Sequence, residues 1–264
     1  MSKQIDRTHL AKLRKVEEER FLANHKKSGE AFTDSQKVMH EGVPMSWMAK
    51  WPGAHPVFVK EAKGAKFTDI DGNTYIDFCL GDTGSMTGHS PDATIAAIKR
   101  QADIGITSML PTLDAAIVSK ELAARFGLPK WQFTVTATDA NRHVIRYCRL
   151  ITGRSKIIVI DRCYHGSVDE TFATLDEAGN TVKREGNLGA PVDLAVTTRV
   201  VEFNDLAGME AALKNGDVAA ILMEPAMTNV GIVLPDDGYL YAVQELAKKY
   251  GALLIIDETH TISV

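Results

Sequence analysis

The chain has 264 residues, of which 45% are hydrophobic and 24% charged, a composition typical of a globular protein with a sizeable core. Its 30 Lys and Arg against 34 Asp and Glu give a net charge of −4, which argues against nucleic acid as a partner. No apolar run approaches the ~18 residues of a membrane helix, and the charged N-terminus lacks the apolar stretch of a secretory signal. Three scattered cysteines without paired spacing exclude a zinc ribbon and indicate a reducing compartment. We therefore expect a cytoplasmic protein with no metal site and no membrane or nucleic-acid partner.

Residues 1–90 are predicted to hold a helix, a loop and a small antiparallel hairpin. Residues 1–40 are polar with a few apolar positions at helical spacing, which predicts a surface helix. Residues 43–56 contain prolines, glycines and two tryptophans and indicate an ordered loop. The Asp71-Gly72 pair separates two strand-like pieces, 66–70 and 74–78. It suits a hairpin turn because Gly accepts a positive φ.

From residue 91 to 264 the pattern is that of one large α/β domain. Helices are predicted from about Pro91 to Ala102 and from Asp114 to Phe126, followed by apolar runs that alternate with helical stretches. The expected strands are Phe133–Thr136, Ile157–Ile160, Arg199–Phe203, Ala219–Met223 and Leu253–Asp257. The expected helices lie near 138–151, 205–214 and 236–250, with a long loop over 176–195. Such alternation predicts adjacent strands in a mostly parallel sheet with helices on both faces.

Polar residues follow several predicted strands, and open α/β sheets bind ligands beyond the carboxyl ends of their strands. Thr136, Ala137 and Thr138 open a helix, whose N-terminus can hold an anion. Tyr164 could stack on a planar ring, and His165 could assist proton transfer or bond locally. Taken alone, each signal also fits a helix cap or a packed loop.

Two carboxylates complete this group. Glu224 and Asp257 each follow an apolar run, where a buried carboxylate is costly unless a cation or strong donors meet it. Together the residues at the strand ends predict a ligand with an anionic group, a flat ring and a basic ring nitrogen. Pyridoxal 5′-phosphate (PLP) has all three parts.

The sequence resembles the class III aminotransferases of PLP fold type I, in particular the branch of glutamate-1-semialdehyde aminomutase. The resemblance begins near Gly42 and rests on an ordered set of motifs: Asp69–Phe78, Gly88–Pro91, Leu110–Thr112, Phe133–Arg146, Tyr164–Gly166, Glu224-Pro225, Asn229–Gly231 and Asp257-Glu258. It implies the large domain of a PLP-dependent transferase. It also implies a homodimer that moves an amino group between an amine or amino acid and an oxo acid or aldehyde.

The resemblance also implies cofactor-binding roles for individual residues. The phosphate is expected at Thr136, Ala137 and Thr138, and Tyr164 is expected to stack on the pyridine ring. Asp257 is expected to pair with the ring nitrogen. The other positions implied are Thr259 against the other ring face, and Glu224 and Asn229 near the ring hydroxyl and Asp257.

No catalytic residue is assigned within the chain. The family's Schiff-base lysine is expected beyond Val264, together with the later strands and the C-terminal small domain, so the chain resembles the N-terminal part only. Three explanations stay open: a fragment of a full aminotransferase, a truncated non-catalytic module that binds PLP or a partner, and a degenerate pseudoenzyme.

The substrate pocket is expected to include Trp47, Met48, Asp82 and His165. Met48 stands where aminomutase-like relatives place an Arg that grips a carboxylate, and Asp82 stands where Trp is frequent. A lost cation and a gained anion disfavour an aminomutase-type substrate, although Asp82 could equally cap a turn. An aminomutase-type isomerase remains the alternative function.

Overall fold

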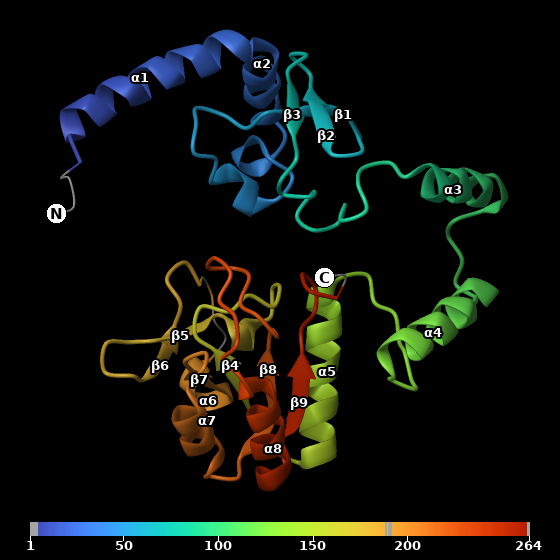
Figure 1. Cartoon of the computed structure of the whole chain (residues 1–264), viewed down its shortest axis with the longest axis vertical. Helices are drawn as coiled ribbons and strands as arrows, with labels where there is room; N and C mark the ends of the chain where they lie inside the picture. The colour runs from blue at the N-terminus through green and yellow to red at the C-terminus, as the bar shows by residue number, and fades with distance from the viewer. Residues whose placement is uncertain (1–4, 188, 190–191, 263–264) are drawn as a thin grey trace. The chain divides into compact units, whose positions relative to one another are not determined.

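The computed structural model describes residues 5–187, 189 and 192–262, and it divides into two compact units at Leu110–Pro111 (Figure 1). The predicted domain boundary followed residue 90 and assigned helix α3 (Asp92–Ile104) to the second domain. In the structure α3 clusters with the first unit instead. Of the helices in the described ranges, none is both long and apolar enough to cross a membrane.

The first unit contains two N-terminal helices, α1 and α2, where one helix was predicted, and it contains the predicted hairpin. The hairpin gains a third strand and forms an antiparallel sheet in the order β1-β2-β3. The Asp71 carboxylate, beside the turn, accepts bonds from the backbone N–H groups of Lys27 and Ser28 at the start of α2. The bounds are α1 Arg7–Asn24, α2 Lys26–Ser35, two 3₁₀ turns at His40–Gly42 and Ser46–Ala49, β1 Val59–Lys63, β2 Lys66–Asp69 and β3 Thr74–Ile76.

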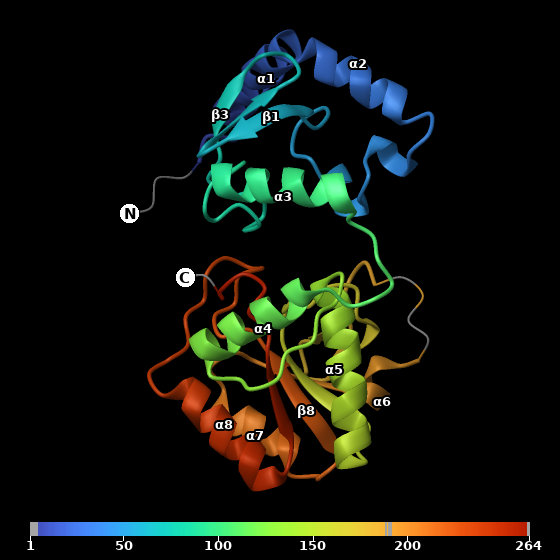
Figure 2. The same cartoon turned by 90° about the vertical axis from the view of Figure 1, so that its right-hand side faces the viewer.

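The second unit is built on a four-stranded parallel sheet in the order β7-β4-β8-β9. Helix α5 lies on one side of the sheet and helices α7 and α8 on the other, which confirms the predicted architecture (Figure 2). The bounds are α4 Leu113–Phe126, α5 Ala137–Thr152, β4 Lys156–Ile160, β7 Thr198–Val201, α7 Leu206–Leu213, β8 Val218–Met223, α8 Tyr239–Tyr250 and β9 Leu253–Ile256.

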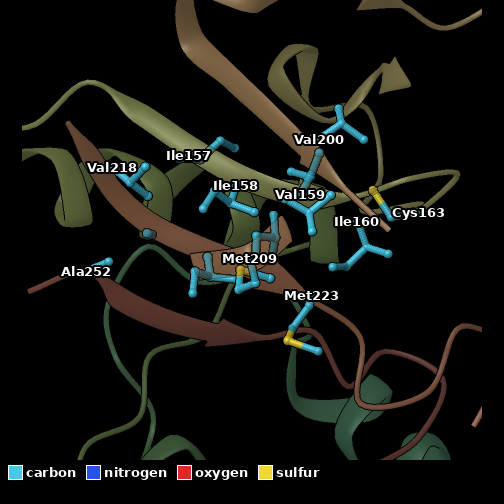
Figure 3. Packing of buried hydrophobic residues seen from close by; sticks show 14 of the residues in the cluster. Ile157, Ile158, Val159, Ile160, Cys163, Val200, Met209, Val218, Met223 and Ala252 are labelled. Carbon is cyan, nitrogen blue, oxygen red and sulfur yellow. The ribbon is translucent and has the colours of Figure 1, made fainter. Parts of the chain in front are cut away.

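The core lies between this sheet and its helices. All six residues of β8 are buried, because its neighbours β4 and β9 cover both edges and helices cover its faces. Figure 3 shows Ile157–Ile160 of β4 beside β8, with Met209 of α7 packed against them. The continuous apolar runs of the sequence thus correspond to strands buried on both faces.

The prediction of a strand at Phe133–Thr136 is wrong. These residues form no ladder with any described strand, and the Val135 side chain is 94% exposed. An apolar run has the propensity for a strand, but a strand exists only where a neighbour completes its backbone hydrogen bonds. In the described part of the chain, β9 pairs only with β8.

The predicted loop over 176–195 is also more ordered than expected. Strands β5 (Ala173–Leu175) and β6 (Thr181–Lys183) form an antiparallel hairpin, and a short helix α6 covers Leu194–Thr197. The Asp176 carboxylate accepts bonds from the backbone N–H groups of Ala178 and Asn180, which closes the turn. Residues 188, 190 and 191 of the predicted loop lie outside the described residues.

Replacing Ile221 by Ala tests the sheet core. Ile221 is fully buried in β8, so Ile221→Ala is expected to lower the free energy of unfolding by about 2–5 kcal/mol. The same substitution at Ile151, which is exposed on α5, serves as the control and is expected to change it by less than about 0.5 kcal/mol. Urea unfolding followed by circular dichroism measures both. Equal effects of the two substitutions would contradict the assigned core.

Candidate functional site

Most of the predicted cofactor residues come together at the carboxyl ends of the strands of the parallel sheet. Strands β4, β8 and β9 are parallel neighbours, so the segments that follow them leave the sheet on the same side. Helix α5 is tied to two of these segments by Asn141, whose Nδ2 donates to Asp257 Oδ2 at 2.9 Å and to the His165 carbonyl at 3.2 Å. The start of α5 and the loops after β4 and β9 therefore form one site.

Asp257 is the most heavily bonded group of the site. Its Oδ2 accepts from Asn141 and from His165 Nδ1, the latter at 2.8 Å. Its Oδ1 accepts from the Thr259 backbone N–H at 3.0 Å and from the Thr259 hydroxyl at 2.5 Å. Burial alone would raise the pKa of this carboxyl group, but the donors, His165 foremost, hold the pKa well below its usual range. Asp257 is therefore ionised.

His165 lies beneath Asp257 and is only 1% exposed. Burial works to lower the pKa of the imidazole, but the bond to Asp257 and the neighbouring Cys163 side chain raise the pKa to about 9. His165 and Asp257 thus form a buried hydrogen-bonded pair, in which the carboxylate favours the protonated form of the imidazole. His165 Nε2 is buried without a hydrogen-bond partner in the described ranges.

The first turn of α5 presents free backbone N–H groups. Thr136 is the N-cap, its hydroxyl oxygen accepts from the Asp139 N–H, and the first intrahelical bond runs from Ala140 N to the Thr136 carbonyl. The N–H groups of Ala137 and Thr138 precede that bond, so no carbonyl of the helix accepts from them. Together with the helix dipole they can hold an anion.

Gly166 brings the loop after β4 against this helix start. Its φ is +78°, and a Cβ there would lie 2.1 Å from the Thr138 hydroxyl oxygen, so only glycine fits. The next residue, Ser167, donates its backbone N–H to the same hydroxyl at 3.1 Å. The Thr138 side chain is thereby held in a fixed place beside the free N–H groups.

Glu224 retains an unused acceptor. Its Oε2 accepts from the backbone N–H and the hydroxyl of Thr228, whereas its buried Oε1 has no partner in the described part of the chain. A buried carboxylate oxygen without a partner can accept a hydrogen bond from the hydroxyl or N–H group of a ligand. Asn229 donates to the Arg162 carbonyl at 3.5 Å.

The structure identifies supports of Asp257 that the sequence analysis missed or placed elsewhere. Glu224 and Asn229 were expected near Asp257, but in the structure Asp257 accepts hydrogen bonds from Asn141, His165 and Thr259. Asn141 was missed altogether. A signal for it exists, because it shares the buried face of α5 with Ile145 and Cys148 at helical spacing, and a polar residue on such a face needs a partner.

Tyr164 and the predicted substrate residues occupy different surroundings. Tyr164 is 46% exposed between two buried neighbours, so part of its ring is open to a ligand. Trp47, Met48 and Asp82 belong to the first unit. Asp82 lies in a turn of residues in the left-handed conformation, with a φ of 57°. The carboxylate that caps this turn is that of Asp77, which accepts from the backbone N–H groups of Cys79 and Gly81.

Comparison with known proteins gives a consistent family. Residues 47–261 match the family described as aminotransferase class III. Relatives named glutamate-1-semialdehyde 2,1-aminomutase include one from Sulfurihydrogenibium sp. (strain YO3AOP1), 35% identical over 90% of this chain and 56% of its own length. Another, from Methanocaldococcus jannaschii, is 34% identical over 89% of this chain and 55% of its own length. The chain thus spans little more than half the length of these relatives.

Solved structures agree. A glutamate-1-semialdehyde aminomutase from Pseudomonas aeruginosa PAO1 superposes with a TM-score of 0.94 at 51% identity, over 98% of this chain and 57% of that one. A variant of that enzyme was solved in complex with PMP. An omega-transaminase from Sphaerobacter thermophilus superposes with a TM-score of 0.81 at 26% identity, over 89% of this chain and 55% of that one. The chain therefore belongs to the class III aminotransferases, a family of PLP-dependent enzymes.

Proposed function

We propose that the protein is a PLP-dependent aminotransferase that moves an amino group between an amine or amino acid and an oxo acid or aldehyde. The observation that carries this proposal is Asp257, a buried and ionised carboxylate at the end of a parallel strand. A carboxylate in this state is suited to hold a proton on a basic ring nitrogen. The family match gives the chemistry that such a contact serves.

The free acceptors and donors of the site fit the parts of PLP. The N–H groups of Ala137 and Thr138 would hold the phosphate, with Thr136 as the cap of the same helix. The orphan Oε1 of Glu224 would accept from the ring hydroxyl, near Asn229, and Tyr164 and Thr259 would lie against the ring. When bound, PLP supplies an electron sink that is stronger when its ring nitrogen is protonated.

Within this site the chain's own residues would hold a proton on the cofactor ring and keep the ring and Asp257 in place. Asp257 would keep the proton on the ring nitrogen, and Tyr164 would shield one face of the ring from water. We propose that His165 supports Asp257 and does not line the substrate pocket, where the sequence analysis had placed it, because its ring is buried. Asn141 acts with it by fixing Oδ2.

The catalytic amine is proposed to lie beyond Val264. Three lysines of the second unit are already engaged: Lys156 Nζ donates to the Ala195 carbonyl, Lys248 to Glu245 and Lys249 to Glu210. None belongs to the cofactor site described above. The chain would therefore bind the cofactor through phosphate and ring contacts alone.

The alternative function is a glutamate-1-semialdehyde aminomutase-type isomerase, which the names of the relatives favour. Met48 and Asp82 argue against it. By the family resemblance, Met48 puts a thioether where aminomutase-like relatives have an Arg, and Asp82 puts an anion where Trp is frequent. We therefore place Trp47, Met48 and Asp82 in a pocket for a substrate other than the aminomutase substrate. Conversion of glutamate-1-semialdehyde faster than amino transfer from simple amines would reverse this preference.

The protein is further proposed to be a cytoplasmic homodimer. Met109, Leu110 and Leu113 carry large apolar side chains that are at least 72% exposed in the single chain. Apolar exposure of this extent is typical of surfaces that another polypeptide covers. By the family resemblance, Met109–Thr112 would lie near the phosphate of the neighbouring subunit.

Replacing Asp257 by Asn tests the buried ion pair. The folded-state pKa of His165 is raised from 6.5 to about 9. The ion pair therefore stabilises the folded protein fully below pH 6.5, and this contribution to the free energy of unfolding is lost as pH rises through 9. In Asp257→Asn, burial dominates and the pKa of His165 is expected to fall, so the free energy of unfolding should no longer decrease between pH 6.5 and 9 through His165. Imidazole NMR titration and urea unfolding at pH 6.5 and 9 measure the effect. The exposed Asp237→Asn is the control, and a wild-type His165 that titrates near 6.5 would contradict the pair.

Amino transfer tests the function itself. In a form of the protein extended through the lysine, Asp257→Asn is expected to keep bound PLP, because the phosphate and ring contacts remain. Its rate is expected to fall about ten- to a hundredfold, since a charged hydrogen bond contributes roughly 1.5–3 kcal/mol. Tyr164→Ala is expected to weaken PLP retention instead. Absence of amino transfer in the extended wild-type protein, tested with a panel of amines and oxo acids, would refute the proposal.

Borohydride reduction tests the position of the catalytic amine. In the 264-residue chain with added PLP, reduction is expected to give no stoichiometric adduct at any single lysine, because the site, as far as the structure describes the chain, includes no lysine. Peptide mass spectrometry after reduction measures the labelling. A single lysine labelled stoichiometrically, with turnover of an amino donor, would show that the catalytic amine lies within these residues.

A further inference from the structure

The hydrogen-bonding capacity of Asp257 is already full in the single chain. A carboxylate has about four lone-pair sites for donors. Oδ2 accepts from Asn141 and His165, and Oδ1 accepts from the N–H and the hydroxyl of Thr259. A protonated ring nitrogen could therefore reach Asp257 only if one of the four donors leaves.

Three of the four donors are held by other constraints. The Thr259 N–H is part of the backbone. Asn141 Nδ2 also donates to the His165 carbonyl, so its movement would break two bonds. His165 is 1% exposed and cannot turn without disturbing the packing around it.

The Thr259 hydroxyl is the donor that can leave. Thr259 is an exposed residue, and rotation about a single side-chain bond would remove the hydroxyl from Oδ1 and place it in water. No other hydrogen bond of Asp257 would change. The bonds to Oδ1 come from the exposed Thr259, whereas those to Oδ2 come from the buried Asn141 and His165.

We propose that the Thr259 hydroxyl is a displaceable donor, which occupies Oδ1 of Asp257 until the protonated ring nitrogen of a pyridine cofactor replaces it. Thr259 is thus a positioning residue that sets the affinity of the site for the cofactor. This inference rests on the proposed function and adds a role for Thr259 beyond contact with the ring face. The hydroxyl keeps the carboxylate satisfied and oriented before the cofactor arrives, and its displacement lowers the affinity.

Calorimetric titration with pyridoxamine 5′-phosphate tests the displacement, since this form binds without a lysine. Thr259→Val has nearly the same shape but no hydroxyl to displace. Its dissociation constant is therefore expected to be about ten- to a hundredfold lower than that of the wild type, the range of one hydrogen bond to a charged group. Thr259→Ser keeps the hydroxyl and is expected to bind like the wild type. In an Asp257→Ala background the hydroxyl has no acceptor, so Thr259→Val is expected to change nothing.

A second measurement uses the chain without cofactor. With one donor fewer, Asp257 interacts more strongly with the imidazolium, so Thr259→Val is expected to raise the pKa of His165, which Asp257 and Cys163 both face, above that of Thr259→Ser. Binding that requires Asp257 but is equal or weaker in Thr259→Val would overturn this inference and leave the proposed function standing. No binding of pyridoxamine phosphate by any variant would overturn both.

Discussion

The site depends on one buried carboxylate whose charge is stabilised from three separate segments. Asp257 follows β9, Asn141 lies on α5, and His165 follows β4. An unpaired carboxylate in this position would take up a proton, because burial penalises its charge. The donors reverse that preference, so the site presents a fixed negative charge. Movement of any of the three segments would weaken this arrangement.

The parallel sheet is what brings these segments together. Because β4, β8 and β9 are parallel neighbours, the residues that follow them emerge at one edge. Glu224 and Asp257 therefore share this edge, although 33 positions separate them in the sequence numbering. The rigid core beneath, fully buried along β8, limits how far the strand ends can shift. Gly166 then allows the loop after β4 to approach the start of α5 closely enough to fix Thr138.

Charge complementarity at the site is divided between two kinds of group. The start of α5 offers partial positive charge from backbone N–H groups, whereas Glu224 offers a buried acceptor oxygen and Asp257 offers a negative charge. A ligand with an anion at one end and a cationic ring nitrogen at the other matches both. His165 adds a positive charge beneath Asp257, which keeps the carboxylate ionised when no ligand cation is present.

The sequence by itself determined the strands with continuous apolar runs, the helix that starts after Thr136 and the family motifs at the strand ends. These are local features, since periodicity and capping act over a few residues. It could not establish whether Phe133–Thr136 pairs with a neighbour, because a strand requires backbone partners from elsewhere in the chain. It also could not assign Asn141 and His165 to Asp257, from which they lie 116 and 92 positions away. Only the tertiary structure decided those contacts, because hydrogen bonds depend on distances in space that the spacing of residues does not contain.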